Sequence, residues 1–594
     1  MAQLDLGILG NASFSALVDD KGRHVWCCLP RFDGDPVFSS LLAGEGEPEF
    51  GFFDVLLDNF RSSEQEYLRN TAILVTRLHD TNGGTIEIID FAPRYRERER
   101  MYRPLMLVRQ IRRISGDPRI RIRLRPAADY GARAAETTHG SNHIRYVLAD
   151  STIRLTTNAS VSYVLEERPF VLEENIDLVL GPDESLETAV TRFSRRSFEQ
   201  TQSYWFEWTR SLSIPFEWQD AVIRAAITLK LCNFEETGAV VAAVTTSLPE
   251  AAGTGRNWDY RYCWLRDAYF TIDALNRLGA TRTMEGFLRF IANLVRSSPD
   301  GRLQPVYGVT QEARLTERQI DSLPGFLGHG PVRVGNQAYE HIQNDVYGSV
   351  VLAATQSFFD HRLRSPGDEK LFERLERVGE QAVKLFDQPD AGLWELRTRA
   401  RVHTFSALMC WAACNRLAKI AEKLIRPDRA RYWREQAEHM HRVICDEAWN
   451  EERGCFAESF GGKDLDASLL LIEHVGFLPA DDPRFASTVE AIEKELRRGP
   501  YLFRYHAADD FGEPRTAFNI CTFWYIDALC ALDREEEARE LFENMLRHTN
   551  HLGLLSEDLD IETGELWGNF PQTYSMVGLI LCATRLSRGW HEAL

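Results

Sequence analysis

Residues 257–278 read NWDYRYCWLRDAYFTIDALNRL and join two different patterns. As far as Asp267 the stretch is dense in aromatic, acidic and basic side chains, and beyond it apolar side chains recur with the spacing of an amphipathic helix. The same alternation recurs through residues 216–594, where segments rich in Trp, Arg, Asp and Glu precede every second predicted helix. If successive helices run antiparallel through short connections, these segments emerge at one end of a bundle and can share one pocket.

The helical periodicity predicts twelve helices in this region. Their expected starts lie near residues 216, 266, 281, 342, 368, 404, 427, 464, 484, 516, 534 and 570. Twelve helices make six helical hairpins, which can close into a double ring of inner helices surrounded by outer ones. The sequence shows no strong self-similar repeat, which disfavours a solenoid. We therefore predict an all-α double ring over residues 216–594.

The first 195 residues follow a pattern of period two. Alternating runs such as TAILVTRLHD (71–80) and TIEIIDFAPR (85–94) flank a turn signal at residues 82–84. Such runs between turn residues are typical of antiparallel strands joined by hairpins. We therefore predict a multidomain protein, with an antiparallel β-sandwich over residues 1–195 and a connecting helix over residues 196–215.

Composition and charge disfavour several classes of partner. The 594 residues include 88 Asp plus Glu and 69 Lys plus Arg, and the net charge of −19 disfavours nucleic acid or anionic membrane as a partner. No apolar run of about 18 residues could cross a bilayer, and the start of the chain lacks the pattern of a secretion signal. We expect a cytoplasmic protein in which most of the eleven cysteines are reduced core residues.

The aromatic and charged segments suit a sugar ligand. Aromatic walls beside hydrogen-bonding charged groups match the apolar faces and hydroxyl rim of a sugar ring. A capped helix start with a structural ion pair would explain the first segment equally well, but convergence of several segments favours a site. The candidate binding residues are Tyr260, Trp264, Arg266 and Asp267, then Tyr339, Gln343 and Asp345, then Trp394, and finally Arg504 and Tyr505.

Two carboxylates on separate segments, Glu395 and Glu557, provide what glycoside hydrolysis requires. One carboxyl, kept protonated, gives a proton to the leaving oxygen, while the other, ionised, attacks the anomeric carbon or activates a water. We expect Glu395 to be the acid, because the neighbouring Trp394 would desolvate its carboxyl, and Glu557 to be the base. The sequence has no phosphate-binding glycine loop, nucleophile elbow or zinc motif, and this mechanism requires neither a cofactor nor a metal.

Several long motifs resemble bacterial members of glycoside hydrolase family 15. In the family's order they are WCCLPRFDGDPVF (26–38), NWDYRYCWLRDA (257–268), QNDVYG (343–348), GLWELR (392–397), MCWAA (409–413) and GLLSEDLDIETGELWGNFPQTYSMVGL (553–579). The resemblance extends over nearly the whole chain. It implies an N-terminal β-sandwich, a helical linker and an (α/α)6 barrel that carries the site. It also implies exo-acting, inverting hydrolysis that releases β-glucose from the non-reducing end of a short α-glucoside or oligosaccharide.

The resemblance also implies roles for single residues. Glu395 matches the family's general acid, and Glu557 matches its general base. Arg266 and Asp267 match the pair that binds the non-reducing glucose. Further sugar contacts are matched by Tyr260, Trp264, Trp394 and Arg504. The chain departs from the family pattern at Asp558, where bacterial relatives often have Glu, and at RVHTFS (401–406), the segment that follows the acid.

Three alternatives remain open at this stage: a trehalase of the same family, an α-glucoside phosphorylase, and a non-catalytic sugar-binding protein. A phosphorylase does not need a second carboxylate, and a non-catalytic protein should lack one of the two. The presence of both Glu395 and Glu557 therefore favours a hydrolase. The choice between α-1,4, α-1,6 and α,α-1,1 linkages stays open. By the resemblance, Pro30–Phe38 is expected to reach over the barrel mouth and shape the site.

Overall fold

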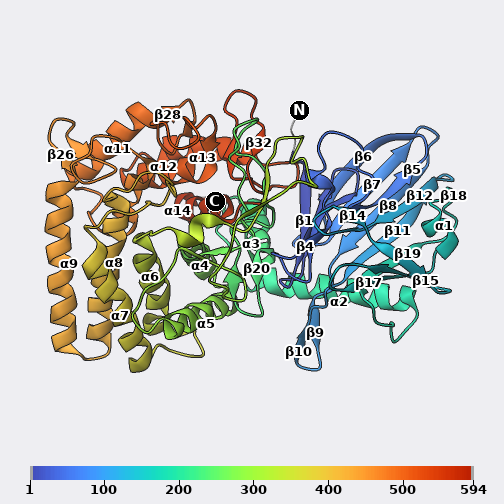
Figure 1. The fold of residues 1–594 in the computed structure, drawn as a ribbon, viewed down its shortest axis with the longest axis horizontal. Coiled ribbons are helices and arrows are strands. Elements are labelled where there is room, and N and C mark those ends of the chain that lie inside the picture. The colour runs from blue at the N-terminus through green and yellow to red at the C-terminus, as the bar shows by residue number, and fades with distance from the viewer. Residues whose placement is uncertain (1–3, 590, 592–594) are drawn as a thin grey trace.

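The computed structural model describes residues 4–589 and 591, and Figure 1 shows two parts that follow each other along the chain. The first part is built mainly of β-strands and the second mainly of α-helices, which confirms the predicted fold class. One hydrophobic core, extending from Leu4 to Leu586, includes residues of both parts. The two parts therefore pack directly on each other. Within the described residues, no helix is long and apolar enough to cross a membrane.

The N-terminal part is a sandwich of two antiparallel sheets. The first has the order β1 (Leu6–Gly10), β2 (Ser15–Asp19), β3 (His24–Leu29), β5 (Phe52–Leu57), β12 (Arg119–Arg125) and β18 (Phe170–Val171), with β4 (Asp35–Phe38) paired to β3. The second has the order β15 (Glu136–His139), β16 (His143–Val147), β17 (Thr152–Thr157), β19 (Ile176–Pro182), β11 (Leu107–Ser115), β8 (Thr85–Phe91), β7 (Leu74–Asp80) and β6 (Phe60–Tyr67).

The turn signal between the two runs quoted above forms the hairpin β7–β8. Asp80 accepts hydrogen bonds from the backbone N–H groups of Asn82 and Gly84, both at 2.7 Å. Gly83 has a φ of 88°, a left-handed conformation that glycine adopts at no steric cost. Ile86 and Ile88 on β8 alternate with Thr85 and Glu87 and are fully buried. The hairpin therefore follows from turn chemistry and alternation together.

A long helix, α2 (Val190–Arg210), connects the sandwich to the barrel. The sequence pattern placed this helix at residues 196–215. Its buried face consists of Ser194, Ser197, Thr201, Trp205 and Thr209, which are mostly small polar residues, so hydrophobic periodicity marks its start poorly. The domain boundaries at 195/196 and 215/216 remain a prediction.

Twelve α-helices follow in the described part of the chain. The inner ring consists of α4 (Leu265–Arg277), α6 (Asp345–Phe359), α8 (Thr404–Lys423), α10 (Leu471–His474), α12 (Asn519–Ala531) and α14 (Thr573–Leu586). The outer ring consists of α3 (Gln219–Leu231), α5 (Thr281–Ser297), α7 (Glu369–Leu385), α9 (Pro427–Glu447), α11 (Pro483–Leu496) and α13 (Glu535–Arg547). Eleven begin within three residues of the expected position. The exception is α10, a single turn preceded by the 3-10 turn Ala467–Leu470.

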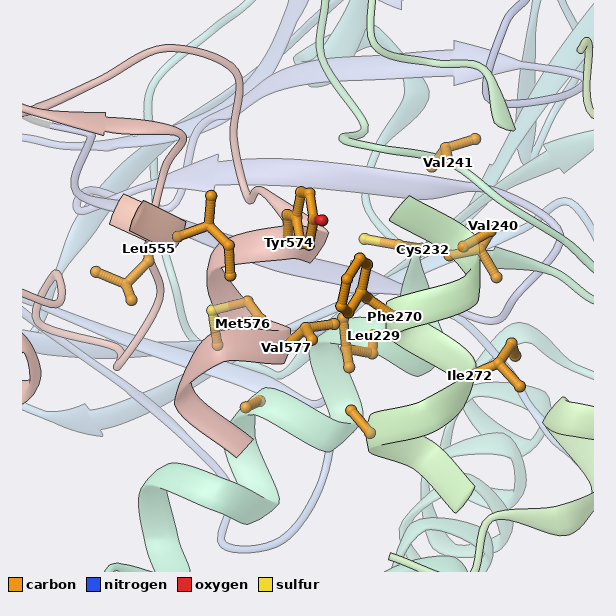
Figure 2. Packing of buried hydrophobic residues seen from close by; sticks show 14 of the residues in the cluster. Leu229, Cys232, Val240, Val241, Phe270, Ile272, Leu555, Tyr574, Met576 and Val577 are labelled. Carbon is orange, nitrogen blue, oxygen red and sulfur yellow. The ribbon is translucent and has the colours of Figure 1, made fainter. Parts of the chain in front are cut away.

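The ring closes where α14 packs against α4. The aromatic side chains of Phe270 on α4 and Tyr574 on α14 have ring centres 5.2 Å apart. Figure 2 shows them beside Leu229 and Val577 in the core. Inner helices such as α12 are buried on nearly every side, whereas outer helices such as α7 bury one face. Because every second helix belongs to the inner ring, the segments that precede inner helices gather at one end of the barrel.

Candidate active site

A pocket lined by charged and aromatic side chains opens at that end of the barrel. Its walls come from the segments that precede α4, α8, α12 and α14, so residues hundreds of positions apart meet in it. Nine of the predicted site residues line the pocket: Tyr260, Trp264, Arg266, Asp267, Trp394, Glu395, Arg504, Tyr505 and Glu557. The structure therefore brings nine of the twelve predicted residues together in one pocket.

Arg266 and Asp267 occupy the first turn of α4. The Arg266 guanidinium is buried and donates to Gln343 Oε1 and Asp345 Oδ2, both at 3.0 Å, and to the Leu393 carbonyl at 3.1 Å. Burial raises the pKa of Asp267 to about 6, while the adjacent Arg266 cation opposes the shift. The pair gives this wall a fixed cation beside a carboxyl, an arrangement that suits the hydroxyl groups of a sugar.

The other three predicted residues do not line the pocket. Gln343 and Asp345 lie behind its wall, where they are buried and orient Arg266, and Gln343 Nε2 also donates to Glu395 Oε1 at 3.2 Å. Tyr339 was expected to bind substrate, but its hydroxyl donates to the exposed Glu340 at 2.8 Å. The 3-10 helix Gln337–Glu340 accounts for this difference, because it places Tyr339 outside the set of pocket-lining residues.

Glu395 lies in the turn before α8 with a φ of 59°, a left-handed conformation that is rare for a residue with a side chain. Its Oε1 accepts a hydrogen bond from Trp264 Nε1 at 2.6 Å, and an Arg266 nitrogen lies 3.9 Å away. The side chain is 25 % exposed, so the desolvated environment expected beside Trp394 is not found. Trp394 instead donates its Nε1 to Asp466 at 2.9 Å.

Glu557 is a buried carboxyl of the pocket, only 1 % exposed. Its Oε1 accepts a hydrogen bond from the Tyr260 hydroxyl at 2.6 Å, and its buried Oε2 has no hydrogen-bond partner among the described residues. Burial raises its pKa well above the usual carboxyl range, and the neighbouring Asp558 and Glu250 carboxyls add to that shift. Glu557 lines the pocket, so its carboxyl can take a proton from a water bound there.

Asp558 shares this buried environment. Burial raises the pKa of Asp558 to about 8, and the Glu250 carboxyl adds to the shift. The Thr516 hydroxyl lies 3.0 Å from both Asp558 Oδ1 and the Glu250 carbonyl oxygen. A carbonyl can only accept, so when Thr516 donates its single proton there, Asp558 must carry a proton to complete the second hydrogen bond. This geometry favours a neutral Asp558, which removes one of the negative charges that oppose ionisation of Glu557.

Sequence reasoning missed five charged residues of the pocket: Glu250, Arg256, Arg397, Asp509 and Asp510. Glu250 accepts a hydrogen bond from Arg504, while Arg256 donates to both Asp509 oxygens, at 2.7 and 2.5 Å. These partners are separated by 254 and 253 positions in the chain. The segment from residue 248 to 256 has no periodic pattern, so the contacts that identify Glu250 and Arg256 exist only in the folded chain.

The pocket mouth is bordered by residues 505–512. Asp509 is paired with Arg256 as described, and the Phe511 ring packs edge-on against Trp258 at 5.2 Å. On the opposite side, the backbone N–H of Arg397 donates to Asp510 Oδ2 at 2.6 Å. These contacts tie the segment to two other walls of the pocket. Among the described residues, no group of three or more His, Cys, Asp or Glu side chains is arranged to hold a metal ion.

Comparison with known proteins agrees with this geometry. The family model described as glycosyl hydrolases family 15 matches residues 218–584, and a trehalase-like N-terminal model matches residues 4–170. The chain therefore belongs to glycosyl hydrolases family 15. The resemblance proposed from the sequence motifs is thereby confirmed.

Similar proteins extend over nearly the whole chain. A trehalase of Mycobacterium tuberculosis is 32 % identical, with 99 % of this chain and 90 % of the relative covered. A trehalase of Thermoplasma volcanium is 31 % identical over 98 % of this chain and 93 % of the relative. The crystal structure of a bacterial glucoamylase complexed with acarbose has a TM-score of 0.70 and 12 % identity, covering 98 % of this chain and 94 % of that one. At that identity the structural likeness shows the shared fold.

Proposed function

We propose that this protein is an inverting α-glucoside hydrolase whose substrate is trehalose. The observation that carries the proposal is the single pocket lined by both Glu395 and Glu557. Each carboxyl accepts a hydrogen bond from an aromatic donor of the same short segment, Trp264 for Glu395 and Tyr260 for Glu557, both at 2.6 Å. Two carboxyls held across one sugar-sized pocket are the requirement for acid- and base-assisted hydrolysis.

In the proposed reaction Glu395 gives its proton to the glycosidic oxygen as the bond from that oxygen to the anomeric carbon breaks. A water in the pocket attacks the same carbon from the opposite face, and Glu557 takes the proton that the water loses. The place of Glu557 in the wall of the same pocket as Glu395 supports this assignment. Arg266 and Asp267 would hold the hydroxyl groups of the ring that is cleaved.

Two observations support trehalose as the substrate. The relatives of about 30 % identity that extend over nearly the whole chain are named trehalases. The segment 505–512, which contributes Tyr505, Asp509, Asp510 and Phe511 to the pocket wall, is held by Arg256 and by the backbone of Arg397. We expect a wall fixed in this way to limit the room for the leaving sugar and so to favour a disaccharide over a long glucan chain.

The proposal is tested by initial rates of glucose release from trehalose, maltose and isomaltose, with and without inorganic phosphate. We expect trehalose to be hydrolysed fastest and free glucose to be the product under both conditions. Faster release of glucose from maltose or isomaltose would show that this sugar, and not trehalose, is the preferred substrate. Glucose phosphate formed only when phosphate is present would indicate a phosphorylase, and no product from any of the three sugars would refute the hydrolase.

A further inference from the structure

The short segment Asp259–Trp264 has two faces with different surroundings. Tyr260 and Trp264 line the pocket. Asp259 and Arg261, the two neighbours of Tyr260, are fully buried on the opposite side, at 0 % exposure each. Side chains of successive residues in an extended segment point to opposite faces, which accounts for this division. Tyr260 and Trp264, which donate hydrogen bonds to Glu557 and Glu395, therefore belong to a segment whose other face is buried outside the pocket.

Arg261 joins the barrel to the N-terminal sandwich. Its guanidinium donates to Asp259 through Nε at 2.9 Å and Nη2 at 2.7 Å, and Nη1 donates to the Gly34 carbonyl oxygen at 2.9 Å. The guanidinium also lies 6.0 Å from the ring centre of Trp26, on strand β3. The Trp26 Nε1 donates to the Val244 carbonyl oxygen at 2.8 Å. The Arg261 Nη1 also donates to Cys28 Sγ at 3.4 Å, so Gly34, Trp26 and Cys28 are sandwich residues that contact this part of the barrel.

The segment next to Val244 pairs with the Tyr260 backbone. The Ala243 N–H donates to the Tyr260 carbonyl oxygen at 3.0 Å, and the Ala242 N–H donates to the Tyr262 carbonyl oxygen at the same distance. Asp259 accepts a further hydrogen bond from the Gly335 N–H at 3.1 Å. Tyr260 therefore lies between Asp259 and Arg261, both of which are held by buried hydrogen bonds, and its hydroxyl donates to Glu557.

The loop that carries Gly34 does not have the role expected from sequence. Pro30–Phe38 contributes none of the described residues that line the pocket, so this loop does not shape the sugar site directly. A carbon added at Gly34 would lie 2.4 Å from the Leu29 carbonyl oxygen, so the loop is closely packed at the point where it meets Arg261. Its contact with the site passes through Arg261.

We propose that the N-terminal domain positions the catalytic base: Gly34 and Trp26 hold Arg261, Arg261 and Asp259 fix the backbone on both sides of Tyr260, and Tyr260 orients Glu557. This inference rests on the proposed function, because it assigns a role to Tyr260 in hydrolysis. Arg261 is a positioning residue that does not touch the substrate. A displacement of the order of 1 Å at a catalytic group can lower turnover roughly 100-fold, so a small shift of Tyr260 is sufficient.

The test compares Arg261→Met with Arg109→Met. Arg109 makes an equally buried two-point contact with Asp90, at 2.8 and 3.0 Å, and its partners all belong to the sandwich. Both changes remove a buried guanidinium and should lower the melting temperature. We expect only Arg261→Met to lower kcat on trehalose, roughly 10- to 100-fold, with KM nearly unchanged.

The pH profile provides a readout that lost stability alone would not change. The Tyr260 hydrogen bond favours ionised Glu557, so loss of that bond should move the acidic limb of the kcat profile to higher pH. We expect this shift in Arg261→Met and in Tyr260→Phe, and no further loss of kcat when the two changes are combined. Gly34→Ala changes a residue of the sandwich alone. We expect it to lower kcat and to shift the acidic limb in the same direction as Arg261→Met, but by a smaller amount.

The proposal is overturned if Arg261→Met and Gly34→Ala keep the wild-type kcat and pH profile, or if Arg109→Met lowers kcat equally. It is also overturned if the losses caused by Arg261→Met and Tyr260→Phe multiply in the double variant, because the two residues would then act independently. Wild-type activity on trehalose is measured first. An inactive wild type would refute the proposed function, whereas an active wild type with the results above would refute this inference alone.

Discussion

Glu395 illustrates how a single residue can combine backbone strain with a function. Its left-handed backbone, at a φ of 59°, costs of the order of 1–3 kcal/mol for a residue with a side chain. A hydrogen bond from its own N–H to the Gly392 carbonyl oxygen, at 3.2 Å, closes the turn. The strained turn directs the carboxyl to Trp264 and Gln343, whose donors fix one of its oxygens. Glu395 therefore has a backbone conformation that is unfavourable for a residue with a side chain but that places its carboxyl in the pocket.

Glu395→Gln and Glu557→Gln should each lower kcat on trehalose by roughly 10³-fold, because each removes one proton-transfer step. The two roles can be separated with α-glucosyl fluoride, whose leaving group needs no proton. We expect Glu395→Gln to recover most of its activity on the fluoride, whereas Glu557→Gln should remain impaired on both substrates. Steady-state kinetics on the two substrates provides the measurement.

Glu340→Gln is the matched control for these variants, because Glu340 is exposed and lies outside the pocket. It should retain wild-type kinetics on both substrates. Equal behaviour of the Glu395 and Glu557 variants on α-glucosyl fluoride would contradict the assignment of separate acid and base roles.

At the scale of elements, Glu557, the proposed base, directly precedes the hairpin formed by β31 (Asp558–Leu559) and β32 (Leu566–Trp567). Gly568, with a φ of 78°, follows β32 directly. A carbon added there would lie 2.6 Å from Glu557 Cβ. Gly564 in the same hairpin has a similar φ of 75°, but an added carbon would come no nearer than 3.3 Å to His548. Alanine substitutions at the two glycines therefore distinguish the effect of backbone strain, which both share, from the effect of crowding Glu557, which only Gly568→Ala has.

Gly568→Ala should lower kcat on trehalose at least 10-fold, because the new methyl group displaces Glu557 from its position at Tyr260. Gly564→Ala should cost a similar amount of stability, about 1 kcal/mol for a left-handed alanine, and leave kcat unchanged. Kinetics and thermal melting of both variants test this expectation. Equal kcat values in the two variants would show that the hairpin does not hold the base in place.

How far the sequence predicts the structure depends on the range of the interactions involved. Helix starts were predicted within a few residues because apolar periodicity and the polar segments before it are local signals. The start of α2 was misplaced because Ser194 and Ser197 face its buried side. The pairs Arg504–Glu250 and Arg256–Asp509 could not be predicted, since nothing near either partner in the sequence marks the other.

At the scale of the whole molecule, buried carboxyls make stability depend on pH in opposite directions. Burial raises the pKa of Asp558 to about 8. Because this folded-state pKa lies above the unfolded value, the contribution of Asp558 to stability is fully present at low pH and is lost as pH rises towards 8. Burial also opposes ionisation of Glu235, but the Lys230 and Arg94 cations outweigh it and lower the pKa of Glu235 to about 2. Its contribution is present near neutral pH and is lost as pH falls below about 4.

Asp558→Asn should therefore match the melting temperature of the wild type at pH 4 and exceed it by about 2–5 °C at pH 8. Asparagine keeps a neutral hydrogen-bonding group beside Thr516 and removes the cost of the buried charge. Glu235→Gln, the control of opposite sign, should lower the melting temperature at pH 8 and lose this effect as the solution becomes acidic. Thermal melts of the three proteins across this pH range provide the measurement, and a pH-independent difference for Asp558→Asn would contradict the assigned proton.

The proposed function requires that Glu395 and Glu557 cleave trehalose across one pocket with inversion at the attacked carbon. Proton NMR of the first glucose released from trehalose, recorded before the anomers equilibrate, tests it most directly. Inversion converts the attacked sugar to β-glucose, while the leaving sugar keeps its α configuration, so we predict equal amounts of the two anomers. Release of α-glucose alone would mean retention and would contradict the account.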